Sequence, residues 1–207
     1  MKNISILGVL FSLVMTTMLS AHAEVLDEQP AGEYNVDLKH ASIVWKVSHF
    51  GLSDYVGRFN RFDATLQLDT EDFTKSSVSV VIETSSLDTD YPNPEKEDFN
   101  EKLIGGMFNG AEFPQIAFTS NSVSELNGDA FTINGELTLL GKTLPVTLDA
   151  RLNGALPAHP FSKKPTIGFG ATTTIDRSSW GVDKYVPNVG VEVKVEIQAE
   201  FTQEASE

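Results

Sequence analysis

The sequence predicts an all-β domain: an antiparallel up-and-down β-barrel of about eight strands, with one short helix near residues 95–104. The first observation behind this prediction is that apolar and polar residues alternate along most of the chain, which is the period of a strand with one buried face. The second is that no helix of crossover length separates the strands, so neighbouring strands should pair antiparallel. A two-sheet sandwich is the structural alternative.

The first half of the chain is predicted to begin with a loose segment, residues 24–33, and to continue in strands. The strands cover residues 34–37, 41–49, 62–69 and 76–83. One face of the second strand carries Ile43, Trp45, Val47 and His49. Residues 52–56 are predicted to form a loop, flanked by Gly51 and Gly57, which we expect to serve a turn that needs positive φ or close approach.

A short helix is predicted after the turn at residues 91–94. Asn93 can cap it and Pro94 suits its first position. Phe99 and Leu103 are one helical turn apart and give it a small apolar face. Two glycines, at 105 and 106, should end it.

The second half returns to strands. They are predicted over residues 115–120, 130–139, 144–152, 166–176 and 190–202, with hairpin turns at 127–129 and 141–142. The last strand has the clearest pattern, because its apolar residues alternate strictly with polar ones. The apolar set is Val191, Val193, Val195, Ile197, Ala199 and Phe201. One face of this strand should therefore be wholly buried inside the barrel.

The N-terminus has the features of a secretory signal peptide over residues 1–23. Lys2 precedes an apolar stretch, and the Ala-His-Ala triplet at 21–23 matches a cleavage signal. The remaining residues, 24–207, suit one domain with a single core. Loss of Lys2 changes the formal net charge from −14 to −15. Such an acidic surface disfavours nucleic acid as a partner and permanent residence on a membrane.

Few residues are placed for catalysis. His40, His49 and His159 lack the short spacings of zinc ligands, no G-x-S-x-G motif occurs, and the chain has no cysteine. Asp37 lies three residues before His40, but on an edge that looks exposed. Most carboxylates occupy outward strand positions, where a charge is simply solvated. The sequence therefore favours a binding protein over an enzyme, with no cofactor and no metal.

Several residues are candidates for ligand binding, each with a structural alternative. His49 could bond a ligand head group at a barrel mouth, or be a satisfied structural histidine. Arg177 could clamp a ligand group, or hold its turn by bonding carbonyl oxygens. The aromatic candidates could line a pocket or simply fill the core. They are Trp45, Phe50, Phe59, Phe62, Phe108, Phe113, Phe118 and Trp180.

Taken together, motifs in register over residues 33–202 resemble the YceI-like family, exported bacterial proteins also described as polyisoprenoid-binding. The matching segments are Tyr34-x-x-Asp37-x-x-His40, Val47-Ser48-His49-Phe50-Gly51, Val56-Gly57-Arg58-Phe59, Phe108 to Phe118 with Phe113-Pro114 at its centre, Gly135-Glu136-Leu137-Thr138, and Arg177-Ser178-Ser179-Trp180-Gly181. Residues 99–108 depart from the R-D-x-H-L-x-S-x-D-F segment of many members, and Ser179 and Trp180 stand where an acidic residue and phenylalanine are usual.

The resemblance implies a lipocalin-like barrel with an elongated apolar cavity for a long isoprenoid chain, such as a quinone or polyprenol derivative. The expected function is that of a periplasmic carrier or storage protein that shields this lipid from water. A homodimer is compatible with this function. Two alternatives remain at this point. One is a stress-related structural or protein-interaction barrel packed by its own phenylalanines, and the other is an enzyme acting on a lipid head group.

Overall fold

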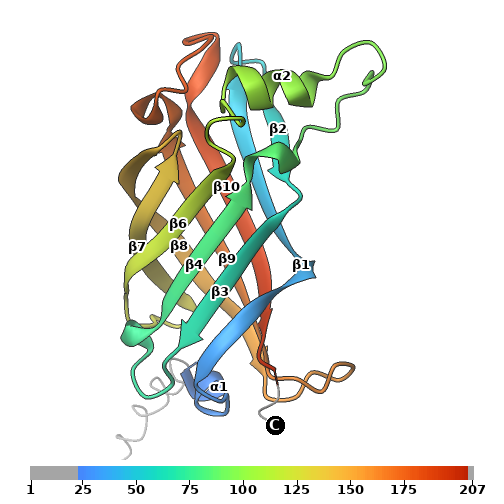
Figure 1. Ribbon diagram of the computed structural model, residues 1–207. Helices are drawn as coiled ribbons and strands as arrows, with labels where there is room; N and C mark the ends of the chain where they lie inside the picture. Colours follow the sequence, from blue (N-terminus) through green and yellow to red (C-terminus); the bar gives the residue numbers. More distant parts are fainter. Residues whose placement is uncertain (1–22, 205–207) are drawn as a thin grey trace, which may run out of the picture.

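The computed structural model describes residues 23–204, which form a closed antiparallel β-barrel (Figure 1). Eight strands make its wall in the order β10-β9-β8-β7-β6-β4-β3-β1, and β1 closes the ring by pairing with β10. Their bounds are β1 Gly32–His49, β3 Phe62–Leu68, β4 Ser77–Glu83, β6 Gln115–Val123, β7 Ala130–Leu139, β8 Lys142–Leu156, β9 Thr166–Asp176 and β10 Val189–Thr202. The predicted barrel is therefore confirmed, while the predicted signal peptide lies outside the described residues except for Ala23.

The helices lie at the two ends of the barrel. Helix α1, Ala23–Asp27, is at the lower end in Figure 1, and α2, Phe99–Gly106, is at the upper end. We call these the α1 end and the α2 end. Three 3₁₀ turns connect strands: η1 Phe73–Lys75, η2 Thr84–Ser86 and η3 Arg177–Trp180. The α1 helix occupies part of the segment predicted to be loose, because the side chain of Leu26 is buried against the barrel.

Strand β1 is continuous, although the sequence predicts two separate strands there. Its first part pairs with β3 through Gly32↔Leu68 and its second part with β2, Ser53–Phe59. Residues 52–56, predicted as a loop, thus belong mostly to β2. The prediction was wrong because the inward side of β2 mixes serine, tyrosine and glycine, which hides the alternation. A short strand, β5 Leu87–Asp88, pairs with the end of β2.

Helix α2 begins later than the sequence predicts. Asp98, not Asn93, is its N-cap, and the Asp98 carboxylate accepts a hydrogen bond from the Glu101 N–H at 3.0 Å. The residues after Asn93 form only a turn, closed by bonds to the Asn93 carbonyl. The helix forms where Leu103 and Ile104 can be buried, because tertiary packing supplies most of the stability of a short helix.

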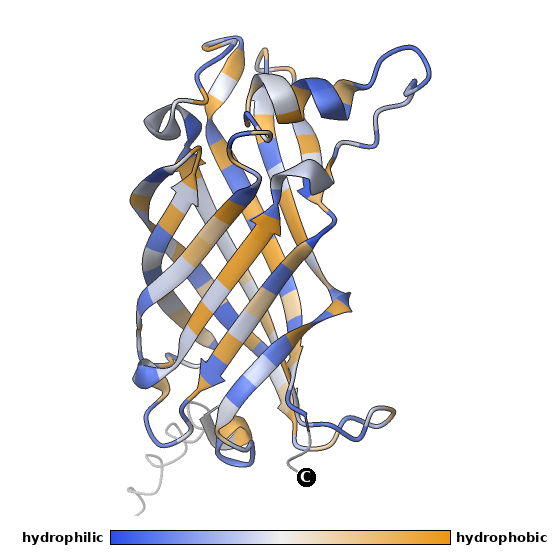
Figure 2. Ribbon diagram, in the orientation of Figure 1, coloured by the Kyte–Doolittle hydropathy of each residue, from blue (hydrophilic) through white to orange (hydrophobic). Residues whose placement is uncertain are grey.

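Hydrophobic and hydrophilic residues alternate along the barrel strands, as Figure 2 shows. The inward side chains form two clusters, one toward each end. The cluster at the α1 end contains three almost fully buried side chains, Tyr34, Leu152 and Ile167, at 0%, 1% and 0% exposure. The cluster at the α2 end includes Leu103 and Trp180. A cavity lies between and within these clusters.

Candidate functional site

The barrel encloses a cavity of about 940 Å³, a size within the usual range for ligand pockets. All eight wall strands and α2 contribute side chains to it, and most of these are aliphatic or aromatic. On β10, Val193, Val195 and Ile197 point inward yet remain only half-buried. They keep accessible surface because they border the cavity instead of a packed core.

Phenylalanines form the floor of the cavity at the α1 end. Phe131 contacts Phe73 and Phe169 edge-on, with ring centroids 5.1 and 5.9 Å apart, and Phe169 contacts Phe201 at 6.2 Å. Edge-to-face pairs of this kind are the favoured arrangement of aromatic rings. Beneath them Tyr34 is fully buried, and burial raises its pKa to about 12. The α1 end is therefore sealed.

The α2 end is the mouth of the cavity. Phe99 of α2 packs against Tyr55 of β2 and stacks on Tyr91, with centroid distances of 5.9 and 5.2 Å. The turn after β1 reaches solvent, since Phe50 is 58% and Leu52 87% exposed. Polar groups border the cavity only sparsely, and several of them lie at this end. They include His49, Glu97, Lys102, Lys184 and Asn188.

Two of these polar groups have partners. Lys102 pairs with Glu97, and their hydrogen bond raises the pKa of the Lys102 ammonium. Lys184 lies with its ammonium 5.2 Å from the ring centroid of Tyr185. Both lysine side chains are long enough to bring their ammonium groups over the mouth of the cavity. A ligand with a polar head group would meet these residues while its apolar part occupied the interior.

Arg177 borders the cavity, but all its hydrogen bonds in the structure go to backbone carbonyls. Its Nε donates to the Gly190 carbonyl at 2.7 Å, and Nη1 donates to the Val182 carbonyl at 2.5 Å. Its Nη2 donates to the carbonyls of Lys184 at 3.1 Å and Val189 at 2.9 Å. Burial lowers the pKa of this guanidinium. These contacts favour the alternative that Arg177 holds its turn.

The structure brings eight of the ten predicted ligand-binding residues to the cavity. These are Trp45, His49, Phe50, Phe59, Phe62, Phe108, Phe118 and Arg177. Phe113 and Trp180 do not line it. Phe113 packs over Gly141, where a Cβ would approach its ring to 2.6 Å. Trp180 is buried in the core, and its Nε1–H donates to the Leu137 carbonyl at 3.2 Å.

Sequence analysis missed several residues of the mouth. Tyr55 was hidden in a segment predicted to be a loop. Lys102 is on the polar side of α2, and Lys184 and Tyr185 lie in a connection without periodicity. The only available signal was the apolar face formed by Phe99 and Leu103, which does point to the cavity.

Comparison with known proteins places this barrel in context. The family model described as "YceI-like domain" matches residues 34–201. "Protein YceI" of Salmonella agona strain SL483 is 33% identical over 202 residues, which is 97% of this chain and 98% of that protein. A "UPF0312 protein" of Yersinia pestis strain Pestoides F is 37% identical over 157 residues, 74% of each chain.

Solved structures share the fold. Burkholderia cenocepacia BcnA superposes with a TM-score of 0.67 at 23% identity, covering 80% of this chain and 98% of that one. A protein from Saccharophagus degradans, described as a polyisoprenoid binding domain implicated in plant cell wall breakdown, has a TM-score of 0.57 at 12% identity, covering 84% and 100%. Among the described residues, no helix has the length and apolar character needed to cross a membrane.

Proposed function

The chain belongs to the YceI-like family, and we propose that it holds a long-chain isoprenoid lipid, of quinone or polyprenol type, inside its barrel. The observation that carries this proposal is the apolar cavity of about 940 Å³, sealed at the α1 end. The protein would act as a carrier or store that shields the lipid from water. The description of the Saccharophagus degradans structure as a polyisoprenoid binding domain supports the choice of ligand.

The walls of the cavity favour a flexible hydrocarbon chain. Each Å² of apolar surface removed from water contributes roughly 25 cal/mol, so the burial of many isoprene units would dominate the affinity. The wall residues on β10 and β4 are mainly valine and isoleucine, which offer no directional contacts. Affinity should therefore depend on chain length more than on chemical detail along the chain.

The sealed floor fixes the orientation of the ligand in this proposal. The lipid tail points toward Phe131 and Phe169, and the head group lies at the mouth near His49, Lys102 and Lys184. Selectivity among lipids should come from this polar end, because a few placed polar groups set orientation in an otherwise apolar pocket.

We also place this function in the periplasm, on the strength of the signal-peptide pattern at residues 1–23. Cell fractionation with sequencing of the mature N-terminus tests this part. A protein retained in the cytoplasm with Met1 intact would contradict it.

The two other functions receive less support. A barrel packed by its own phenylalanines would leave no cavity, whereas the inward residues of β10 here are half-buried around one. An enzyme acting on the head group would need positioned acid, base or nucleophile groups at the mouth. Lys102 is paired with Glu97 and Arg177 with backbone carbonyls, which suits binding better than catalysis.

The direct test is native mass spectrometry of the protein purified from its own cell envelope, followed by solvent extraction. We expect one isoprenoid molecule per protein, and the same spectrum reports whether the protein is a dimer. An empty protein that also takes up no added quinone or polyprenol would refute the proposal.

A matched pair of variants tests whether the cavity is the site. Ala171 borders the cavity, while its neighbour Thr172 is exposed on the outer face of β9. Ala171→Trp should fill cavity volume and reduce lipid uptake by at least about tenfold, a change of 1.4 kcal/mol in binding. Thr172→Trp should leave uptake unchanged. Equal uptake by two folded variants would place the lipid elsewhere.

A further inference from the structure

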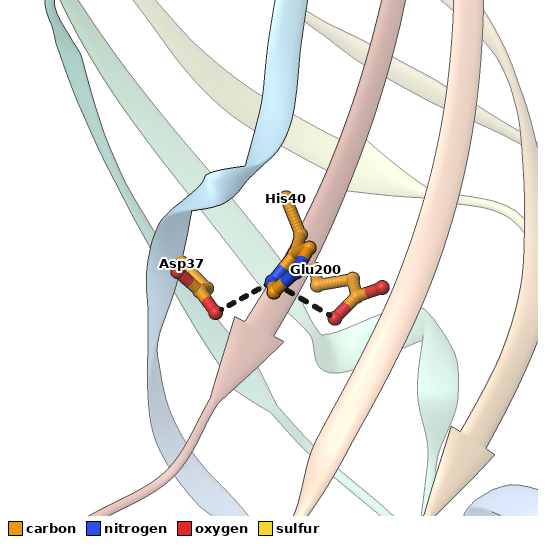
Figure 3. A group of neighbouring side chains, drawn as sticks. All are labelled: Asp37, His40 and Glu200. Carbon is orange, nitrogen blue, oxygen red and sulfur yellow. Dashed lines mark hydrogen bonds and ion pairs between the residues drawn. The ribbon is translucent and has the colours of Figure 1, made fainter. Parts of the chain in front are cut away.

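A group of three metal-ligating side chains lies on the outer face of the barrel, where β1 meets β10 (Figure 3). His40 Nδ1 is 2.9 Å from a carboxylate oxygen of Asp37 and 3.7 Å from one of Glu200. The ligand atoms of all three residues lie within 4.8 Å of one another. The group is separate from the cavity and has no part in the function proposed above.

An irregularity in strand pairing builds this group. Val36 pairs with Phe201 and Ala41 pairs with Ala199, so four residues of β1 stand opposite Glu200 alone. Extra residues of this kind form a bulge, which bends the strand and redirects its side chains. Here the bulge turns Asp37 and His40 toward the outward-pointing Glu200. Asp37 and His40 therefore meet Glu200, which is distant in sequence, at the seam that closes the barrel.

The donor set and its spacing fit a zinc ion. Imidazole nitrogen and carboxylate oxygen bind Zn²⁺ at about 2.0–2.2 Å, so ligand atoms around a tetrahedral ion are about 3.3 Å apart. The two separations from His40 Nδ1, 2.9 and 3.7 Å, lie on either side of that value, and the two carboxylates have ligand oxygens within 4.8 Å of each other. An ion could thus enter the group with small side-chain rotations.

The surroundings leave room and charge for a cation. The side chains of Asp37, His40 and Glu200 are 30%, 56% and 41% exposed, so water can complete the coordination. Glu200 on β10 pairs with Gly168 on β9, and this glycine has no side chain that could crowd the site. Both carboxylates form ion pairs with His40. Lys39 in the bulge is a nearby positive charge that would oppose a bound cation.

We propose that Asp37, His40 and Glu200 bind a Zn²⁺ ion, with water in the fourth position. A bound ion would connect β1 to β10 at one of the two places where their pairing register shifts, the one between Val36 and Ala41. It would thus fasten the barrel closure without entering the cavity. The assignment goes beyond lipid binding, and lipid-free and lipid-loaded protein should bind the ion alike.

The test is isothermal titration of ZnCl₂ into the tag-free protein after treatment with EDTA. We expect saturable binding of one ion per chain. His40→Gln and the near-isosteric Glu200→Gln should each weaken it by at least about tenfold, the loss typical when a metal site loses a supporting group. His159→Gln, at a half-buried histidine in the connection between β8 and β9, is the matched control and should bind like the wild type.

Two further measurements need no assumption about how the variants fold. Zinc should shift the imidazole NMR signals of His40 in the wild-type protein and leave those of His159 in place. At about 100 times the dissociation constant, zinc should raise the melting temperature of the wild type by about 5–10 °C. Absence of saturable binding, or binding that His40→Gln and Glu200→Gln leave unchanged, would show an exposed ion pair only and overturn the assignment.

Discussion

Replacement of Arg177 with alanine should strongly destabilise the mouth of the barrel. The guanidinium donates four hydrogen bonds to backbone carbonyls between Val182 and Gly190, and the residue is only 5% exposed. Hydrogen bonds from a charged donor contribute about 1.5–3 kcal/mol each, but removal of a buried charge also relieves its desolvation cost. The net loss should be about 3–5 kcal/mol, comparable to breaking a buried ion pair.

Chemical denaturation of the wild type and variants measures this loss of unfolding free energy, and thermal denaturation measures the corresponding change in melting temperature. For a chain of this length, 1 kcal/mol changes the melting temperature by about 2–4 °C, so Arg177→Ala should melt about 6–20 °C lower. Arg177→Lys keeps the charge but lacks the planar fork that reaches several carbonyls, and should recover less than half of the loss. Arg151→Ala removes an exposed 3.8 Å ion pair and should cost less than about 1 kcal/mol.

Two results would refute this account of Arg177. If Arg177→Ala cost no more than Arg151→Ala, the carbonyl contacts would not hold the connection between η3 and β10. If Arg177→Lys were as stable as the wild type, charge alone would suffice and the fork geometry would not matter. Either result would favour the alternative role of Arg177, which is contact with a ligand group.

Further substitutions test the packing and the polar contacts. Gly57→Ala should cost about 1–3 kcal/mol and change tryptophan fluorescence, because the new Cβ would lie 2.2 Å from the Trp45 ring; Gly105→Ala, with nothing within 4 Å in α2, should gain up to about 1 kcal/mol. Equal effects of the two would contradict the close approach. Tyr34→Phe should cost about 0.5–1.5 kcal/mol at neutral pH through loss of a buried hydrogen bond. Because burial raises the pKa of Tyr34 from 10.0 to about 12, wild-type stability should fall as pH rises through that interval, and the variant should lose that dependence. The backbone N–H of Asp90 lowers the pKa of Asp88 below 3.8, so its contribution should be present above pH 3.8 and disappear on further acidification. Denaturation of Asp88→Asn should lack that acid-dependent step, and an unchanged pH profile would argue against it.

The strand pattern of the sequence favoured a barrel over a two-sheet sandwich, and the structure confirms the barrel. The alternation in residues 41–49 and 190–202 assigns inward faces that the structure places around the cavity. It works because each strand of a closed barrel has one face in water and one face inside. The pairing of Trp45 with Val195 then follows from antiparallel closure, but its exact register depended on the bulge before Ala41.

Sequence could not locate elements whose stability comes from tertiary contacts. Strand β2 exists because β1 offers it a full set of backbone partners, although its own residues include Gly57. Helix α2 was predicted, but its start at Phe99 depends on the burial of Leu103. Asn93 is a favoured residue type for an N-cap, but in the structure the carboxylate of Asp98 caps the helix instead.

The sequence predicted which residue types line the candidate site, but not which of them reach the cavity. Alternation tells which face of a strand a residue occupies, and eight of the ten chosen residues do border the cavity. It cannot tell whether a side chain meets the cavity or a neighbour. Phe113 and Trp180 have the same chemistry as Phe59 and Phe118, yet they pack against a glycine turn and a carbonyl.

Side-chain size along the inner wall explains why this barrel is hollow. Strand number and tilt fix the diameter of a barrel, so the inward side chains must span that width if the interior is to be filled. Above the floor several of them are short: Val195 on β10, Ala171 on β9 and Val80 on β4. Trp45 and Phe118 pair with Val195 and Val80 and fill only part of the width. In the floor, by contrast, four phenylalanines contact one another and close the barrel. Short residues on several wall strands and aromatic contacts at the closed end together make a long pocket with one mouth, which is the shape that a lipid with a polar head and a long tail requires.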